Sequence, residues 1–491
     1  MLFNSFKFLM FFPIVVGLYF MIPYRFRWVW LLGASYYFYM SWKPEYIILI
    51  LISTIIDYYA SHKMGSIKEK EKRKKYLILS LFTNLGLLFL FKYYNFFQSS
   101  LGYLCKNFQL NVELPTFKLL LPVGISFYTF QTLSYTIDVY KGKIEPERHF
   151  GIFALYVSFF PQLVAGPIER SKHLLPQFYK KHKFDLERIS DGLVQMAWGF
   201  FKKIVIADRL AILVDNVYNN VYEFQGIQLI IATIFFGFQI YCDFSGYSDI
   251  AIGLARIMGF DLMKNFNKPY FAKSIPEFWR RWHISLSTWF KDYLYIPLGG
   301  NRVNKWRWTF NLFITFIISG LWHGANWTFV IWGGLHGLYQ IISINTKNVR
   351  NYMVKFLNFD KIPLIYNFYR RLVTFSLINF AWIFFRANNF NDAKYVVNNL
   401  FVGLNNIFNL QWMKDSISSL GFSKFQLVIA VALIGFMETI HILQGNKSIT
   451  DMISSKPIIV RWAIYYTIIF GIIILGVYGY EEKSQFIYFQ F

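Results

Sequence analysis

Residues 320–327 read GLWHGANW and interrupt an apolar stretch that covers residues 310–342. Gly320 and Gly324 lie four residues apart on either side of His323, a spacing that lets neighbouring backbone approach closely or lets the helix end. The whole stretch is long enough to enter hydrocarbon, where an ionisable side chain is costly and usually marks a functional site. The sequence therefore predicts a broken membrane helix with an imidazole at the break.

A second histidine, His283, lies in the stretch PEFWRRWHISLSTWFKDYLYIPLGG at 276–300. Ser274 to Glu277 has the form of a capping box, with a proline just inside the helix start. The residues that follow carry bulky apolar side chains at helical spacing, so we expect one continuous helix lying in the membrane interface. His283 falls at the edge of that apolar face and is expected to point towards protein.

The composition of the whole chain is typical of a membrane protein. Of the 491 residues, 55% are hydrophobic and 16% are charged, whereas soluble domains have about 25% charged residues. The candidate spans are 8–22, 28–40, 44–60, 76–97, 117–140, 150–166, 190–215, 228–258, 309–344, 371–386, 425–444 and 459–479. We predict a single all-α polytopic domain over residues 1–491, with about 10–12 spans and broken or re-entrant helices around a central tunnel.

The distribution of charge indicates the topology. The formal net charge is +23, and the basic residues lie in short loops between apolar runs. This placement follows the positive-inside rule, and no soluble basic domain is visible that could bind nucleic acid. The lysine-rich loop 61–76 is predicted to be cytoplasmic. Because the basic segments 141–148 and 170–188 flank the run 150–166, we expect this run to be re-entrant.

Several motifs resemble the membrane-bound O-acyltransferase family, in the branch that O-acetylates bacterial exopolysaccharides such as alginate. Besides the two histidine segments, they are FPQLVAGPIER at 160–170, YCDFSGYSDIAIG at 241–253 and QFIYFQF at 485–491. The resemblance runs nearly end to end. It implies a multi-pass enzyme of the bacterial cytoplasmic (inner) membrane in which His323 matches the catalytic histidine. His283 also matches the family's pattern.

The chemistry that the resemblance implies is acyl transfer to a hydroxyl group. A positioned imidazole that takes the hydroxyl proton contributes about 10² to 10⁴ in rate. We predict His323 as the general base, with His283 orienting the donor or binding the developing oxyanion. The donor is expected to be acetyl-CoA or another acyl thioester, whose activated carbonyl needs no metal. No tightly bound cofactor is expected, and no metal-spaced Cys/His set occurs in the sequence.

The region 264–307 carries nine lysines and arginines against two acidic residues. We predict that Arg280, Arg281 and Lys291 help to dock the anionic donor on the cytoplasmic face. The alternative is that most of these charges are solvated and only set the topology.

The resemblance also implies a partner and an acceptor outside the membrane. The acyl group would pass to a secreted or membrane-anchored protein of the SGNH-hydrolase type, which decorates a cell-surface polysaccharide. Two alternatives stay open: a related enzyme that moves D-alanine onto teichoic acids, and a transporter without chemistry, although no internal repeat is visible. His336 is predicted to pack, because thirteen residues of continuous helix would turn it about 140° away from His323. The roles of Asp243 and Asp249 stay open.

Overall fold

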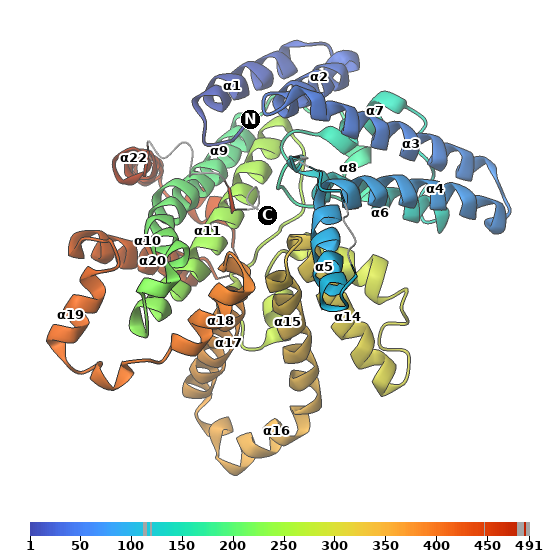
Figure 1. The fold of residues 1–491 in the computed structure, drawn as a ribbon. Coiled ribbons are helices and arrows are strands. Elements are labelled where there is room, and N and C mark those ends of the chain that lie inside the picture. Colours follow the sequence, from blue (N-terminus) through green and yellow to red (C-terminus); the bar gives the residue numbers. More distant parts are fainter. Residues whose placement is uncertain (111–114, 118–119, 446, 479–485, 488–491) are drawn as a thin grey trace. The chain divides into compact units, whose positions relative to one another are not determined.

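The computed structural model describes residues 1–110, 115–117, 120–445, 447–478 and 486–487. Within these residues the regular structure is helical and contains no strand (Figure 1). The chain forms two compact units. Unit 1 comprises Met1–Met196 and Tyr247–Lys264, and unit 2 comprises Ala197–Gly246 and Asn265–Phe491. The predicted all-α class is confirmed, whereas the single domain over residues 1–491 stays a prediction.

Unit 1 contains the first eight α-helices, most of the ninth and the end of α11. The α-helices are α1 (Phe6–Met21), α2 (Arg27–Met40), α3 (Ile47–Ser66), α4 (Lys70–Leu88), α5 (Tyr94–Asn107), α6 (Ile125–Tyr140), α7 (Phe150–Ser158), α8 (Ser171–Phe178) and α9 (Leu186–Phe200). Shorter elements are η1 (Tyr24–Phe26), η2 (Pro44–Tyr46) and the π-helical η3 (Phe89–Tyr93). α3, α4 and α6 pack on one another. The buried carboxylate of Asp57 accepts hydrogen bonds there from Ser80 Oγ at 2.5 Å and Asn84 Nδ2 at 2.9 Å.

Unit 2 contains the remaining helices. They are α10 (Asp208–Asn219), most of α11 (Ile227–Met258), α12 (Ile275–Trp279), α13 (Ile284–Phe290), α14 (Lys305–His323), α15 (Trp327–Asn345), α16 (Lys347–Phe356), α17 (Pro363–Arg386), α18 (Phe390–Asn399), α19 (Leu410–Ser418), α20 (Lys424–Gln444), α21 (Ile449–Ser454) and α22 (Ile458–Leu475). Between them lie the π-helical η4 (Phe201–Ala207) and η7 (Lys291–Tyr295), and the short η5 (Val221–Glu223), η6 (Pro269–Phe271), η8 (Phe359–Lys361) and η9 (Leu404–Asn406).

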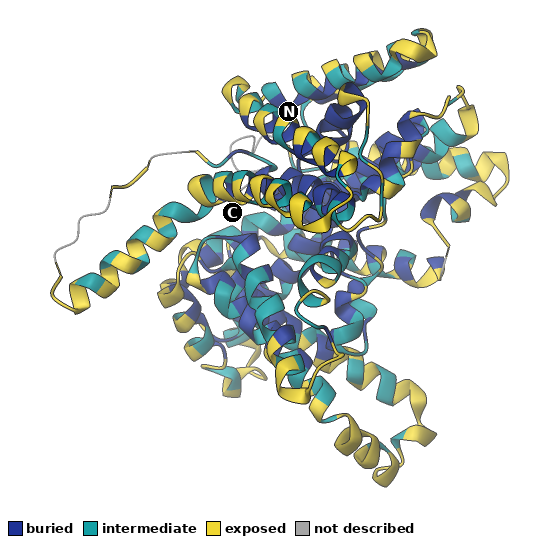
Figure 2. Cartoon of the chain, turned by 90° about the vertical axis from the view of Figure 1, so that its right-hand side faces the viewer, coloured by how far each residue is buried: buried dark blue, intermediate teal, exposed yellow. Residues whose placement is uncertain are grey.

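Among the described residues, 5 helical segments are long and apolar enough to cross a membrane. They are Pro44–Ser66, Lys70–Asn107, Ile227–Met258, Lys424–Gln444 and Ile458–Leu475. The last of these, α22, is strongly apolar and yet has no buried residue. Figure 2 shows exposed and buried residues alternating along many helices, and apolar side chains left exposed in this way suit contact with lipid. The predicted number of spans and the central tunnel stay predictions.

The basic segments of unit 1 meet on one side of that unit. α7 has nine residues, far fewer than the roughly 20 needed to cross hydrocarbon. The Tyr179 hydroxyl donates a hydrogen bond of 2.6 Å to the Glu147 carboxylate, and Arg27 Nη1 donates one of 2.6 Å to the carbonyl of His182. The segments before and after the run 150–166 therefore contact each other, and the later segment also contacts the start of α2. The re-entrant course of this run stays a prediction.

Candidate functional site

α14 and α15 cross at glycines and place His323 at their corner. His323 is the last residue of α14, and Gly324 caps the helix in an extended conformation. A Cβ atom added at Gly320 would collide with the carbonyl of Phe329, and one added at Gly333 would collide with the carbonyl of Phe316. Only residues without a side chain allow the two backbones to come this close. The predicted helix break at His323 is confirmed.

Aromatic rings enclose the imidazole of His323, which is 4% exposed. The ring centres of Trp322 and Trp332 lie 5.0 Å from that of His323, and the ring of Phe385 lies 5.4 Å away. These rings keep the histidine in apolar surroundings, where a hydrogen bond or a charge contributes more than it does in water.

The prediction of one continuous helix after Ile275 is wrong. The Ser274 hydroxyl caps α12 by accepting the Glu277 N–H at 3.3 Å, as the capping pattern predicts. α12 nevertheless ends at Trp279, and α13 begins only after His283, whose backbone is left-handed at φ 41° and ψ 56°. The break has a physical cause, because the Ile284 N–H donates to the carbonyl of Asn265 at 2.9 Å instead of to a helical partner.

Asn265 also fixes the state of the His283 imidazole. Its Oδ1 accepts the backbone N–H of Ser285 at 3.3 Å and the Ser285 hydroxyl at 3.0 Å, so this atom is an acceptor. His283 Nδ1 lies 3.1 Å from the same oxygen and must therefore carry the proton of the neutral ring. The basic lone pair is left on Nε2. Sequence reasoning missed Asn265, because nothing in its local sequence indicates a contact 18 residues away.

The structure brings the two predicted histidines together in unit 2. Their ring centres lie 6.5 Å apart, and the ring of Phe244 packs edge-on against His283 at 4.6 Å. This separation is too long for a direct hydrogen bond between the imidazoles but short enough for both to reach one group placed between them. Two buried bases at this distance can share the proton of a bound hydroxyl.

His336 and His323 pack against the same tryptophan, Trp332. The estimate of about 140° assumed one continuous helix, whereas α14 ends at His323 and α15 starts at Trp327. The ring centres of His323 and His336 lie 5.0 and 4.8 Å from that of Trp332. The Trp279 indole donates a hydrogen bond of 3.3 Å to His336 Nδ1. His336 is fully buried, and its packing role stays a prediction.

The three residues predicted to dock the donor lie in different surroundings. Arg280 is exposed. Arg281 is held by Glu277 in an ion pair of 2.8 Å and is therefore part of the local fold. Lys291 lines a mainly apolar cavity of about 200 Å³, whose wall includes Trp279 and Phe316. The structure thus leaves Arg280 and Lys291 as the more accessible cations.

A buried ionic cluster in unit 2 was not predicted. Lys203 Nζ lies 2.8 Å from the carboxylate of Asp208 and 2.5 Å from that of Asp243, and all three side chains are at most 8% exposed. Asp243 also accepts the backbone N–H of Ile487 at 2.8 Å. Most of the segment 485–491 lies outside the described residues. The signal for this cluster is the lysine pair inside the apolar run GFFKKIVIA, since buried charges need partners.

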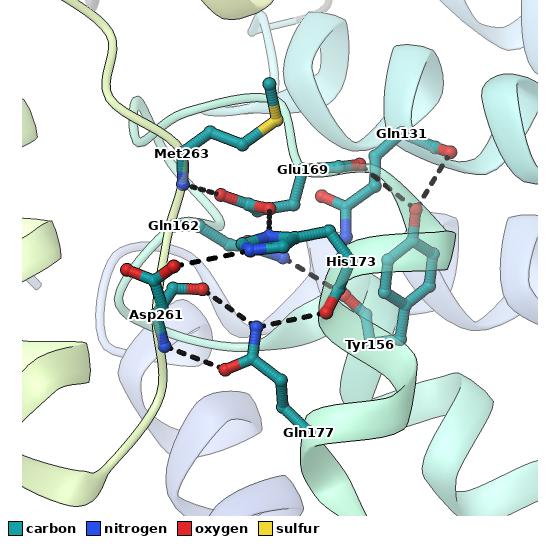
Figure 3. A network of polar contacts seen from close by, with 8 residues as sticks. All are labelled: Gln131, Tyr156, Gln162, Glu169, His173, Gln177, Asp261 and Met263. Carbon is teal, nitrogen blue, oxygen red and sulfur yellow. Dashed lines mark hydrogen bonds and ion pairs between the residues drawn. The ribbon is translucent and has the colours of Figure 1, made fainter.

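A second unpredicted cluster lies in unit 1 and includes Glu169 of the AGPIER motif (Figure 3). The fully buried carboxylate of Glu169 lies 2.9 Å from His173 Nδ1 and accepts the backbone N–H of Met263. His173 Nε2 faces Asp261 at 3.4 Å. Burial raises the pKa of Glu169, and the hydrogen bond with Glu169 raises the pKa of His173. The cluster ties α8 to the segment after α11.

Comparison with known proteins places these features in a family. Residues 42–385 match the membrane-bound O-acyltransferase (MBOAT) family. The chain belongs to this family; it is an O-acyltransferase and a multi-pass membrane protein. The resemblance noted from its motifs is confirmed.

Three relatives illustrate the range of the family. The chain is 41% identical over 396 residues to "Probable alginate O-acetylase AlgI" of Pseudomonas aeruginosa, a match that covers 80% of this chain and 73% of that protein. It is 34% identical over 505 residues to the peptidoglycan O-acetyltransferase of Helicobacter pylori, covering 94% and 91%. A match to the teichoic acid D-alanyltransferase of Streptococcus thermophilus, at 30% identity over 234 residues, covers 45% and 56%.

Proposed function

We propose that the protein transfers an acetyl group from acetyl-CoA or a related acyl thioester towards a cell-surface polysaccharide, with His323 and His283 at the reacting centre. The observation that carries this proposal is the convergence of the two histidines at 6.5 Å inside a ring of aromatic side chains. The site lies at the end of a helix, where the backbone is interrupted. Donor and acceptor are the two substrates, and no metal takes part.

The proposed step is a direct substitution at the thioester carbonyl. His323 takes the proton of the acceptor hydroxyl, whose oxygen forms a bond to the acyl carbon while the carbon–sulfur bond breaks. The thiolate leaves and receives the proton. Neutral His283 presents a lone pair at Nε2, since Nδ1–H is held by Asn265. This tautomer favours a role as a hydrogen-bond acceptor, and it disfavours oxyanion binding by the neutral ring.

The proposed acceptor is inferred from the names of the relatives. The alginate and peptidoglycan enzymes both act on polysaccharides by O-acetylation, as their names state. We place the protein in the bacterial inner membrane, with the donor on the cytoplasmic side. A secreted or membrane-anchored partner of the SGNH-hydrolase type is proposed to receive the acyl group and deliver it to the glycan.

Two acceptors compete within this proposal. An exopolysaccharide is favoured by the higher identity to the alginate relative, and peptidoglycan is favoured by a match that covers 94% of this chain. Ester-linked acetate measured separately in the isolated cell wall and in the secreted polysaccharide of a deletion strain decides between them. D-alanyl transfer is less well supported, because that match covers under half of the chain.

The histidines are tested by substitution in membranes that contain equal amounts of each protein. His323→Ala should abolish acetyl transfer while donor binding is retained, since the base contributes little to ground-state affinity. His283→Ala should also lower transfer, and the double variant should be no worse than His323→Ala alone. The exposed His62→Gln serves as the matched control. Near wild-type transfer by His323→Ala would contradict the mechanism.

A further inference from the structure

A cavity of about 170 Å³ opens in unit 1 between the α1–α2 connection and α8. Its floor is apolar and buried, and it includes the rings of Tyr19, Phe178 and Phe260. Its rim carries the exposed cations Arg25 and Lys180. The cavity therefore combines an aromatic floor with a positively charged mouth.

The two exposed cations at the rim differ from Arg27 in their contacts within the described residues. The charged residues that line the cavity are Arg25, Arg27 and Lys180, with no carboxylate among the described lining residues. Arg27 is occupied, because its guanidinium donates to the carbonyls of His182 and of two residues near the end of α1. The side chains of Arg25 and Lys180, by contrast, form no hydrogen bond or ion pair within the part of the chain that the structure describes. Arg25 rests on the ring of Phe26 at 4.7 Å.

Glu147, which is hydrogen-bonded to the cavity-lining Tyr179, forms no ion pair with Arg25 or Lys180 among the described residues. Glu147 accepts the Tyr179 hydroxyl at 2.6 Å and the backbone N–H of His149 at 2.8 Å. These hydrogen bonds hold the carboxylate to the wall of the fold. Two unpaired cations beside an apolar floor are chemically suited to an anion that carries an apolar part.

The surroundings of the cavity point to lipid. α1 ends at Met21, which is 79% exposed, and the nearby Phe26 and Phe184 are 49% and 61% exposed. The ring of Phe184 packs edge-to-face against Phe20 at the end of α1. Arginine and aromatic residues gathered at a helix end are typical of the headgroup layer. The positive-inside rule places this side of unit 1 in the cytoplasm, where the leaflet is rich in anionic lipid.

The size of the cavity limits what can enter. Pockets for drug-sized ligands measure roughly 300–1,000 Å³, and 170 Å³ is well below that range. A whole acyl-CoA cannot be enclosed, whereas a phosphate with a small alcohol group can. We propose that this cavity binds the phosphate-bearing headgroup of an anionic phospholipid, with the phosphate between Arg25 and Lys180 and the acyl chains outside in the bilayer.

The proposal is tested by lipid binding to the full-length protein. Purified protein in neutral detergent is titrated with phosphatidylglycerol, and bound lipid is counted by native mass spectrometry. The double variant Arg25→Gln/Lys180→Gln should bind phosphatidylglycerol roughly tenfold more weakly or worse, because both cations that attract the phosphate are removed. Phosphatidylcholine should bind weakly to both proteins. The matched control is Arg302→Gln/Lys305→Gln, two exposed cations of unit 2, which should bind like the wild type.

A competition experiment distinguishes a lipid ligand from a soluble phosphate ligand. Glycerol 3-phosphate should fail to displace phosphatidylglycerol at matched concentration, since it lacks the chains that anchor the lipid. Displacement at equal concentration would overturn the lipid proposal in favour of a free phosphate ligand. Unchanged phosphatidylglycerol binding by the Arg25/Lys180 double variant would overturn the site itself. Neither result depends on the histidines, so failure here leaves the proposed acyl transfer untouched.

Discussion

His283 Nδ1 lies 3.1 Å from Asn265 Oδ1, and this contact sets the position of the proton on the His283 ring. The asparagine holds Ser285 through the same oxygen, so His283 is kept in a left-handed conformation at the start of α13. A left-handed non-glycine residue is costly and persists only where its surroundings enforce it. One of the described left-handed residues is therefore a predicted catalytic histidine.

Replacing Asn265 should impair catalysis more than substrate binding. Asn265→Ala removes the acceptor that holds His283 Nδ1–H, so the imidazole can adopt the other tautomer and other orientations. Loss of such a supporting hydrogen bond costs about 10- to 100-fold in activity at metal sites, and we expect a fall in kcat of this order. Asn265→Asp keeps an acceptor oxygen and should recover part of it. Equal kcat values for the alanine variant and the wild type would contradict the orienting role.

Lys203 should be essential for stability. Lys203→Met leaves Asp208 and Asp243 buried without their cation, and breaking a buried pair in this way costs about 3–5 kcal/mol. We expect a lower thermal unfolding midpoint or a loss of inserted protein. Adding Asp243→Asn to Lys203→Met should restore part of the stability, because one unpaired charge is removed. An unfolding midpoint for the single variant within error of the wild type would show that the cluster is dispensable.

The stability of unit 1 should fall as the pH rises above neutrality. Both Glu169 and His173 have raised pKa values in the folded protein, so the folded state binds protons more tightly than the unfolded chain. The stabilisation is fully present below the ordinary pKa of each group and is lost as the pH rises through the folded pKa. For His173 this window begins at about pH 6.5. Unfolding midpoints measured from pH 6 to pH 8 test the slope.

The control for this pH dependence is His173→Gln, which can still donate to Glu169 but cannot titrate. It should flatten the slope above about pH 6.5 while leaving the acid side of the curve in place. A slope identical to that of the wild type would assign the pH dependence to other groups.

The helices could be predicted because their signals are local. Helices α3, α11 and α20 begin and end within a few residues of the apolar runs that predicted them. The break after His323 was predicted from Gly320 and Gly324. Local signals are also what a single sequence carries best. The re-entrant course predicted for the run 150–166 rests on flanking charges of the same sign and stays a prediction.

The site details that could not be predicted depend on distant partners. The conformation of His283 is set by Asn265, and the burial of Lys203 is matched by Asp243, which is 40 residues further along the chain. Periodicity favoured a continuous helix through His283, but tertiary hydrogen bonds outweighed it. The same holds for His336, whose distance from His323 depends on how α14 and α15 cross.

The donor platform should depend on Arg280 and Lys291 more than on Arg281. Arg281 is paired with Glu277 at 2.8 Å, so reversing it disturbs α12 and does not report on the donor. Arg280→Glu reverses the charge of an exposed residue. Lys291→Glu reverses a charge at the wall of the cavity of about 200 Å³. Each should raise the KM for the acyl thioester several-fold at low salt and leave kcat near its normal value, because a charge that attracts the donor acts on binding.

Two further measurements complete this test: a series of salt concentrations, and a variant in which a more distant charge is reversed. The rise in KM should shrink as ionic strength increases, since the Debye length falls from about 10 Å at 0.1 M to about 3 Å at 1 M. Arg302→Glu, which reverses another exposed cation, should leave KM unchanged if the effect is local and should raise it if the whole basic face attracts the donor. If KM is unchanged in correctly inserted Arg280→Glu and Lys291→Glu proteins, the basic residues of 264–307 serve the topology alone, and the thioester must reach His323 by contacts that do not involve these cations.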